Sequence, residues 1–235
     1  MIFAAGLGTR FKPWTDHHPK ALAVVNGKSL LQRNVEYLQT QGITDVVVNV
    51  HHFADQIVDA VAQNQGWGSQ VIISDETDAV LETGGGLVKA RPLLDGDSPF
   101  VTINADILTD FNIANLLAFH QQEQALISFA VSDRPTSRYF LFDETNRLSG
   151  WTNTQTGEER IVRPVSHLHR MAYSCVVVFE PAVFPLIRQT GKFSLTDMYL
   201  DLAPEHKIMG FPHSGDRWMD VGKTDSVKKA EAIFE

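Results

Sequence analysis

The stretch that decides the fold is the opening one, MIFAAGLGTRFKPWTDHHPKAL (residues 1–22). Its first five residues are apolar and lack the basic start and long apolar core of a secretion signal, so they predict a buried first strand. Gly6 and Gly8 follow at once, and Arg10 and Lys20 add two cations. Glycine allows close backbone approach and positive φ, so consecutive N–H groups of such a loop can surround an anion. We therefore expect a strand that leads directly into a phosphate-binding loop.

The loop fits neither of two common phosphate-loop motifs. The dinucleotide-binding fingerprint needs a glycine where Phe11 stands and a helix that starts inside the motif, whereas Lys12, Pro13 and Trp14 prolong the loop. A Walker loop ends in Gly-Lys-Ser/Thr, which this loop does not contain. From the loop alone, a tight turn with a solvated arginine and lysine explains the residues equally well.

The composition limits the classes of partner. The chain has 235 residues, 43% of them hydrophobic, which is enough for one domain with a sizeable core. Its formal charge of −8 argues against nucleic acid and anionic membranes, since both bind clustered basic residues. No apolar run is long enough to span a bilayer. Cys175 is the only cysteine, so we expect no internal disulfide and a cytoplasmic location, while the oligomeric state stays open.

Strand and helix patterns alternate over the first 124 residues. Runs rich in Val and Ile predict strands at 45–50, 70–76 and 99–106. Apolar residues at helical spacing predict helices at 29–42, 53–63, 85–94 and 113–124. We expect Ser29 and Asp110 to cap two of these helices and Pro92 to end a third. The alternation is typical of βαβ units, so we predict an α/β fold with a doubly wound, mostly parallel sheet.

The pattern changes near residue 125. Short runs separated by Asn, Gly and Asp turns predict a small antiparallel insert or lid, with strands at 125–133, 138–145, 147–153 and 171–180. Two short helices, a last strand and a closing helix are expected at 180–189, 195–205, 217–222 and 224–235. We find no linker, so we expect a single domain over residues 1–235, with a nucleotide-binding half at 1–124 and a second half at 125–235.

Four segments, in order along the chain, resemble the motifs of one enzyme family. They are AAGLGTRFKPWT followed by PKAL, then LETGGGLVKA, VTINADILTDF and WMDVGKTDSV. Together they resemble the sugar-1-phosphate nucleotidylyltransferases, and most of all the short, single-domain members typified by the N-acetylmuramate 1-phosphate uridylyltransferases. The resemblance implies a Rossmann-like fold of the glycosyltransferase-A type. It also implies that a nucleoside triphosphate, with UTP favoured, reacts with a sugar 1-phosphate bound by the second half, giving an NDP-sugar and pyrophosphate.

Two aspartates are candidates for a metal site. Asp106 follows the buried-looking run FVTIN and Asp220 follows RWM, so both are expected at the carboxyl ends of strands, where open α/β sheets bind ligands. The resemblance implies that both ligate Mg²⁺, which proteins hold with one or two carboxylates. Either aspartate alone is explained as well by a turn or a helix cap. We expect Asn104 to orient Asp106 or to contact the ribose.

The resemblance also implies nucleotide contacts. Arg10 and Lys20 are expected to neutralise phosphate charge and to act in catalysis with the two aspartates. In ETGGG, three glycines before a helix leave backbone N–H groups free for a ligand, so this segment either contacts the base or is only a flexible turn. The other predicted contacts are Ala4, Ala5, Gly6, Gly8, Thr9, Glu82, Thr83 and Gly84.

The second half offers fewer candidates. Cys175 lies in the apolar run YSCVVVF and is expected to be an inert core thiol. The resemblance places this cysteine where relatives carry a glycine, next to the expected sugar. The segment 157–170 carries histidines and arginines that either meet an anionic sugar or form a solvated face.

Other functions stay open at this point. A mannose- or heptose-1-phosphate guanylyltransferase, or a choline-phosphate cytidylyltransferase, keeps the fold and changes the substrates, although ETGGG weighs against choline. A catalytically silent, regulatory nucleotide-binding protein is expected to lack a carboxylate or Lys20, and this sequence has them all.

Overall fold

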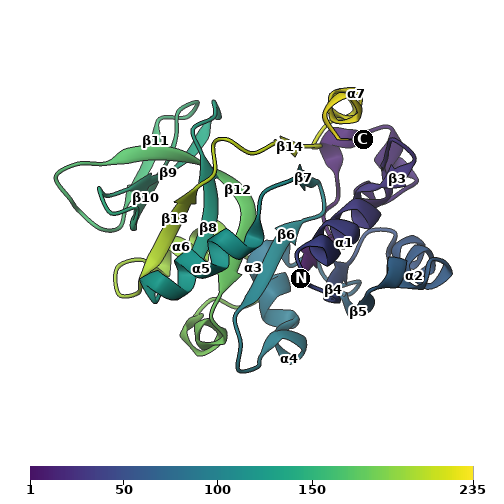
Figure 1. Cartoon of the computed structure of the whole chain (residues 1–235), viewed down its shortest axis with the longest axis horizontal. Helices are drawn as coiled ribbons and strands as arrows, with labels where there is room; N and C mark the ends of the chain where they lie inside the picture. Colours follow the sequence, from purple (N-terminus) through teal and green to yellow (C-terminus); the bar gives the residue numbers. More distant parts are fainter. Residues whose placement is uncertain (235) are drawn as a thin grey trace.

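The fold is built around a mixed sheet that runs across the molecule (Figure 1). The computed structural model describes residues 1–234. Parallel strands form the centre in the order β6-β1-β4-β5, and antiparallel strands continue the sheet beyond β6 in the order β12-β9-β10-β11. A branch leaves this path at β12, where β8 pairs with β12 and β13 pairs with β8. These strands are β1 (Ile2–Phe3), β4 (Asp45–Val50), β5 (Gln70–Asp75), β6 (Phe100–Asn104), β8 (Ile127–Ser132), β9 (Arg138–Phe142), β10 (Leu148–Asn153), β11 (Glu158–Ile161), β12 (His169–Phe179) and β13 (Ile208–Pro212).

Two short antiparallel ribbons accompany the main sheet. They are β2 (Val24–Val25) with β3 (Lys28–Ser29), and β7 (Ile107–Thr109) with β14 (Trp218–Asp220). The α-helices are α1 (Leu30–Thr40), α2 (Ala54–Gln63), α3 (Glu82–Lys89), α4 (Arg91–Leu94), α5 (Ile113–Glu123), α6 (Leu195–Leu202) and α7 (Thr224–Ile233). Short 3₁₀ turns are η1 (Thr9–Phe11), η2 (Trp14–Asp16), η3 (Lys20–Leu22), η4 (Gln65–Gly68) and η5 (Pro181–Leu186).

Helices cover both faces of the parallel strands. Ile2 and Val48 belong to the hydrophobic core that α1, α2 and α5 complete. Their chain neighbours Phe3 and Val47 belong to a second core on the opposite face, to which α3 and α6 contribute. Successive residues of a strand point to opposite faces, so strands buried on both sides are apolar throughout. The predicted α/β fold with a doubly wound sheet is therefore confirmed.

The antiparallel strands extend the main sheet instead of forming a separate lid. β12 pairs with β6, with Val176 opposite Ile103, and β12 also pairs with β8 and β9. β11 and β13 were absent from the predicted elements. β13 pairs in parallel with β8, from Ile208 opposite Ile127 onwards. Its sequence, IMGFP, contains the glycine and proline that usually mark a loop.

Several predicted helix boundaries need correction. Ser29 caps α1 as expected, because its side chain accepts a hydrogen bond from Gln32 N. Asp110 does not cap α5; Asn112 does, through Ala114 N, and Asp110 pairs with Arg217. Pro92 does not end a helix, since it occupies the first turn of α4, where a missing N–H costs nothing. The predicted closing helix is present as α7, and its final residue, 235, lies outside the described residues.

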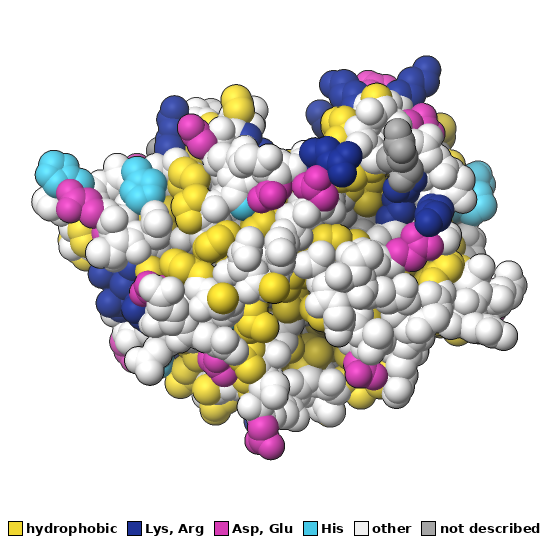
Figure 2. All heavy atoms as spheres, in the orientation of Figure 1, with side chains coloured by type: hydrophobic (Ala, Val, Ile, Leu, Met, Phe, Trp, Pro, Cys, Tyr) yellow, Lys and Arg dark blue, Asp and Glu magenta, His cyan; other side chains and the backbone are white. Residues whose placement is uncertain are grey.

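The two predicted halves meet in the main sheet, where β6 pairs with β12, and again at the β7–β14 ribbon (Figure 1). In the space-filling view, charged side chains gather along the upper edge, near β7, β14 and α7 (Figure 2). Within residues 1–234, none of the helices is both long and apolar enough to cross a membrane. The sheet passes through both predicted halves, and the single-domain assignment stays a prediction.

Candidate active site

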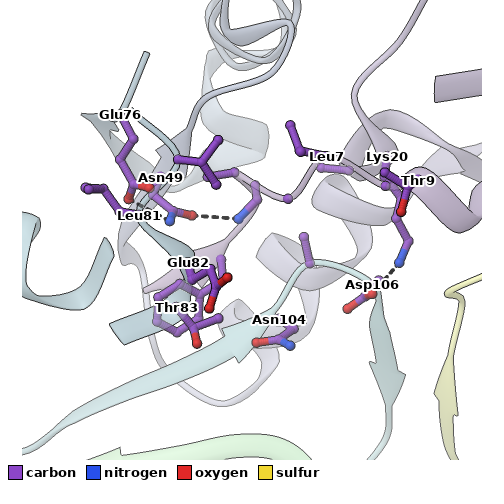
Figure 3. Close-up of a pocket in the computed structure, with 18 of the residues that line it drawn as sticks. Leu7, Thr9, Lys20, Asn49, Glu76, Leu81, Glu82, Thr83, Asn104 and Asp106 are labelled. Carbon is purple, nitrogen blue, oxygen red and sulfur yellow. Dashed lines mark hydrogen bonds and ion pairs between the residues drawn. The ribbon is translucent and has the colours of Figure 1, made fainter. Parts of the chain in front are cut away.

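A cavity of about 430 Å³ opens at the carboxyl ends of β1, β4 and β6 (Figure 3). It lies where an open α/β sheet is expected to bind a ligand. The predicted site residues that line it are Ala4, Ala5, Gly6, Gly8, Thr9, Arg10, Lys20, Glu82, Thr83, Asn104 and Asp106. The structure thus brings together the first loop, the start of α3 and the end of β6.

The first loop has the conformation that its glycines predict. Gly8 has a φ of 60°, in the left-handed region that glycine adopts most easily. A Cβ atom at Gly8 would lie 2.9 Å from Thr15 Cγ2 and 3.1 Å from Lys20 Cβ, so a side chain there would displace Lys20. Thr15 fixes the same turn, because its hydroxyl donates to Gly8 O at 2.9 Å. The loop therefore holds Lys20 against the cavity.

Lys20, Asp106 and Asp220 form the charged centre of the site. The Lys20 ammonium donates to Asp106 Oδ2, and the two groups form an ion pair. Asp220 Oδ1 is buried and has no hydrogen-bond partner among the described residues. Burial, followed by the negative charge of Asp106, raises the pKa of Asp220, while Lys20 and Arg10 act in the opposite direction. Two carboxylates and two cations thus share one small volume.

Asp220 reaches this centre by a route that differs from the prediction. It does not follow a strand of the central sheet; it ends β14, which pairs with β7 and places Asp220 opposite Ile107. Val221 N donates to Asp106 O at 2.8 Å, which fixes the two aspartates side by side in the backbone. A Cβ at Gly222 would lie 2.6 Å from Asp220 Oδ1, so only glycine leaves room for that oxygen in its present position.

Asn34 holds the backbone on both sides of Asp106 and was absent from the predicted site. Its side chain is 1% exposed and its Nδ2 donates to Ala105 O at 3.0 Å and to Ile107 O at 3.1 Å. The same amide donates to Leu30 O within α1. The sequence did carry a signal, because Asn34 is a polar residue on the face of a helix that is otherwise apolar.

Asn49 and Glu76 close the opposite end of the cavity (Figure 3) and were also absent from the prediction. Asn49 Oδ1 accepts from Ala4 N at 2.7 Å, and Asn49 Nδ2 donates to Glu76 Oε1 at 2.8 Å. Burial raises the pKa of Glu76. Both residues come from the ends of Val- and Ile-rich strands, where the sequence shows only a strand followed by polar residues.

The ETGGG segment lies inside a helix, which corrects its predicted role. Residues 84–86 occupy α3 and are buried, so they do not precede the helix with free N–H groups. Gly84 N donates to Phe193 O at 2.9 Å, and Gly84 does not line the cavity, whereas Glu82 and Thr83 do; the nucleotide contact of Gly84 stays a prediction. A Cβ there would lie 2.4 Å from the Phe193 ring. Close packing of α3 against residues 191–193 explains glycine here.

Cys175 belongs to β12 and lies beside Asp106 and Asp220. Its φ of 59° is unusual for a residue with a side chain, and it falls where the pairing of β12 with β8 shifts register between Tyr173 and Val177. The thiol is only half-buried by surface area. Burial and the charges of Asp106 and Asp220 raise its pKa, which keeps the thiol protonated and agrees with the expected inertness.

The family is settled by comparison. A model of the nucleotidyl transferase family matches residues 1–235. This chain therefore belongs to that family, and its relatives are sugar-1-phosphate nucleotidylyltransferases. An N-acetylmuramate alpha-1-phosphate uridylyltransferase of Neisseria meningitidis is 30% identical, over 99% of this chain and 96% of the relative. A mannose-1-phosphate guanyltransferase of Schizosaccharomyces pombe is 27% identical, over 95% of this chain and 60% of the relative.

Solved structures agree on the fold. HddC from Yersinia pseudotuberculosis, complexed with GMP-PN, superposes with a TM-score of 0.79 at 21% identity, covering 100% of this chain and 98% of that protein. A UDP-glucose pyrophosphorylase complexed with UDP-glucose gives a TM-score of 0.79 at 18% identity, with 99% and 96% covered. The sugar-1-phosphate nucleotidylyltransferase family predicted from the four motifs is thus confirmed.

Proposed function

We propose that the chain transfers a uridylyl group from UTP to N-acetylmuramate 1-phosphate or a closely similar sugar 1-phosphate, and releases pyrophosphate. The observation that carries the proposal is the charged centre, where Asp106 and Asp220 lie beside Lys20 and Arg10 at the edge of a nucleotide-sized cavity. The uridylyltransferase relatives, of which this chain covers at least 95%, support the choice of base and sugar.

The residues act mainly by holding two anions that repel each other. Lys20 and Arg10 neutralise charge that accumulates on the α-phosphate and the leaving pyrophosphate as the acceptor oxygen attacks. Lys20 is held by Asp106, and Arg10 lies near Asp220 and Gly222, so both cations are at the site before the substrates bind. The backbone of the first loop fixes the triphosphate, which supplies the orientation that an in-line displacement needs.

The carboxylate pair fits Mg²⁺. Asp220 Oδ1 is buried without a partner, and the pKa of Asp220 is raised by burial and by Asp106, so a cation between the two carboxylates would satisfy both. Mg²⁺ prefers oxygen ligands and usually takes one or two carboxylates, with phosphate oxygens and water completing its shell. When bound, it would neutralise phosphate charge and orient the substrates. No group of three or more His, Cys, Asp or Glu side chains suited to a metal occurs within residues 1–234, so the proposed site has the two carboxylates and relies on phosphate oxygens and water for its other ligands.

A guanylyltransferase is the second candidate, and Glu76 is the observation that favours it. Oε1 of Glu76 accepts from Asn49 Nδ2, which leaves Oε2 at the far end of the cavity for a donor of the base. Guanine offers two such donors, N1–H and the 2-amino group, whereas uracil offers one. Relatives and structural neighbours of this chain include guanyltransferases and a protein complexed with GMP-PN.

We also infer a cytoplasmic location, since the single cysteine allows no internal disulfide and needs no oxidising compartment. Fractionation of the native cells would test this inference, because recovery outside the cytoplasmic fraction would contradict it.

A matrix of substrates tests the proposal. UTP, GTP, CTP and dTTP are each incubated with Mg²⁺ and with N-acetylmuramate, mannose, glucose or heptose 1-phosphate, and pyrophosphate release is measured. We expect turnover with UTP and N-acetylmuramate 1-phosphate to exceed every other pair. Preference for GTP would select the second candidate, and no turnover with any pair would exclude both.

A further inference from the structure

Arg134 is a cation on the second half of the molecule whose hydrogen-bonding capacity is only partly used. It lies in the loop between β8 and β9, half-buried, with its guanidinium stacked on Trp218 at 3.8 Å from the ring centroid. Its Nη2 donates to Tyr173 O at 2.5 Å. Its Nε is buried without a partner, and within residues 1–234 it forms no ion pair with a carboxylate.

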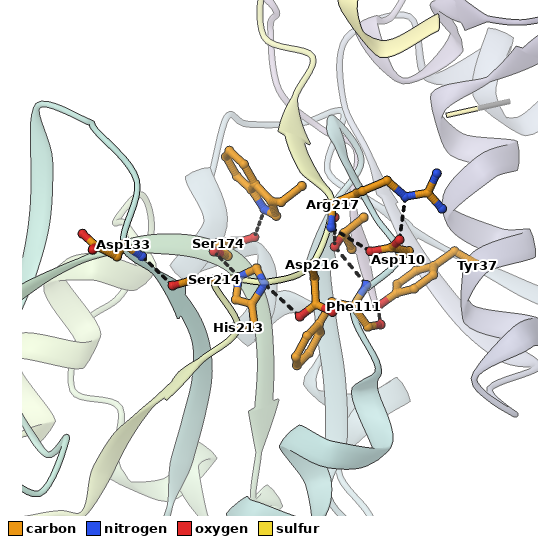
Figure 4. A network of polar contacts seen from close by, with 11 residues as sticks. Tyr37, Asp110, Phe111, Asp133, Ser174, His213, Ser214, Asp216 and Arg217 are labelled. Carbon is orange, nitrogen blue, oxygen red and sulfur yellow. Dashed lines mark hydrogen bonds and ion pairs between the residues drawn. The ribbon is translucent and has the colours of Figure 1, made fainter. Parts of the chain in front are cut away.

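The platform under Arg134 is fixed. Trp218 Nε1 donates to Ser174 O at 2.9 Å, and the Ser174 hydroxyl contacts His213 Nε2 at 2.6 Å (Figure 4). Ser174 is fully buried, so this connection cannot move far. The guanidinium therefore stays in one place relative to β14.

This place lies beside the carboxylate pair. Trp218 precedes Asp220 by two residues on β14. Burial lowers the pKa of Arg134, and the charge of Asp220 acts in the opposite direction. The pKa of Asp220 is raised by burial and by Asp106, and the charge of Arg134 opposes that increase. Lys20 and Arg10 approach the aspartates from the first half of the chain, whereas Arg134 approaches from the second. The three cations therefore flank the centre from both parts of the molecule.

We propose that Arg134 binds the phosphate of the acceptor sugar 1-phosphate. In-line displacement requires the acceptor oxygen to approach the α-phosphorus from the side opposite the leaving pyrophosphate, so its phosphate needs a counter-charge of its own. A guanidinium with unused donors suits a phosphate, and stacking on an indole leaves its edge available. The site at Arg134 thus binds the dianion of a phosphate monoester. The proposal rests on the proposed function.

A structural role is the competing explanation, because stacking on Trp218 also ties the loop after β8 to β14. Arg147 provides a matched control. Its Nε is likewise buried without a partner, and its Nη2 reaches a backbone carbonyl, that of His206, at 3.4 Å. Its charged neighbours are Arg163 and Asp143, and neither Asp106 nor Asp220 is among them.

The experiment compares Arg134→Met, Arg134→Lys and Arg147→Met by steady-state kinetics and by calorimetric titration of the sugar 1-phosphate. We expect Arg134→Met to raise the KM and the Kd for the sugar 1-phosphate about 10- to 100-fold, as loss of a charged hydrogen bond does. The KM for the nucleoside triphosphate should change less than about twofold. Arg134→Lys should recover part of the loss, and Arg147→Met should change neither KM.

Three outcomes would overturn the assignment. An active Arg134→Met with an unchanged KM for the sugar 1-phosphate would leave Arg134 a structural residue. Equal increases in both KM values, or an increase that Arg147→Met reproduces, would do the same. A wild-type chain that turns over no substrate pair would instead remove the proposed function, and with it this assignment.

Discussion

The two sides of the charged centre are built differently. On the first-half side, the loop at residues 6–20 makes its own shape, through Gly8 and the bond from Thr15 to Gly8 O. On the second-half side, Asp220 and Arg134 owe their positions to contacts with distant segments, such as β7 and Trp218. Local geometry can be inferred from neighbouring residues, whereas long-range pairing cannot. The comparison predicts that substitutions in the loop at residues 6–20 lower the catalytic rate with little loss of stability. Substitutions at Asp220 or Arg134 should lower both the rate and the stability.

The largest effect is expected for the aspartates. Asp106→Asn and Asp220→Asn should each lower kcat by about 10³-fold or more, since each removes charge from the proposed metal site. The double variant should be little worse than either single one, because residues that act as a unit are non-additive. Single-turnover rates and melting temperatures would be measured. A destabilised but active Asp220→Asn would show that this aspartate is only a structural residue.

Lys20→Ala tests the first side alone. We expect kcat to fall about 10²- to 10³-fold while the melting temperature changes little, because Lys20 stabilises charge that grows in the transition state. Lys12→Ala is the control, since Lys12 is exposed, forms an ion pair with Asp16 and does not line the cavity. Steady-state kinetics of both variants would decide. Near wild-type kcat in Lys20→Ala would contradict a catalytic role.

Asn34→Leu tests whether Asn34 positions Asp106 for catalysis in addition to stabilising the fold. Loss of the bonds to Ala105 O and Ile107 O should cost about 1–3 kcal/mol of stability, since two carbonyls stay buried and lose a donor. We expect an additional, roughly tenfold loss of kcat, because the turn that carries Asp106 is then free to shift. Asn153→Leu removes a comparable buried amide from β10 and should lower the melting temperature alone. Equal kcat in the two variants would count against positioning.

The smallest effect is a dependence of stability on pH. Burial lowers the pKa of His120 and of His213 below the usual 6.5. Each of these two histidines then binds protons less readily in the folded protein than in the unfolded chain, so its contribution to stability is complete above about pH 6.5 and declines as the pH falls below it. We expect the melting temperature to drop by a few degrees between pH 7 and pH 5.5. His213→Asn should flatten part of this decline, whereas exchange of the exposed His17 should leave it unchanged.

Much of the fold could be predicted because its signals are local. Helix α1 has its cap, its apolar face and its terminal glycine within 14 residues, and β4 is a continuous β-branched run. β13 was not predicted because a strand that ends in proline and contains glycine has the composition of a loop. Asp110 was misassigned as a cap because its true partner, Arg217, lies more than a hundred residues away.

The site residues also divide into those with local signals, which could be predicted, and those that depend on long-range contacts. Residues next to glycines of the first loop and at the end of β6 could be named in advance. Asn34, Glu76 and Arg134 could not, since their roles depend on which distant backbone or charge they meet after folding. ETGGG misled for a physical reason, because glycines that admit a ligand and glycines that admit a phenylalanine ring have the same sequence pattern.

The β7–β14 ribbon also dictates when the charged centre can exist during synthesis. Asp106 is synthesised after the first loop and α1, but Asp220 follows 114 residues later and is placed by the pairing of β14 with β7, opposite Ile107. At about 5–20 residues per second, that interval lasts roughly 6–23 seconds. Throughout it, a nascent chain can shape its first loop and still lack the second carboxylate. The centre is thus completed last, when the strand that carries Asp220 closes against the core built before it.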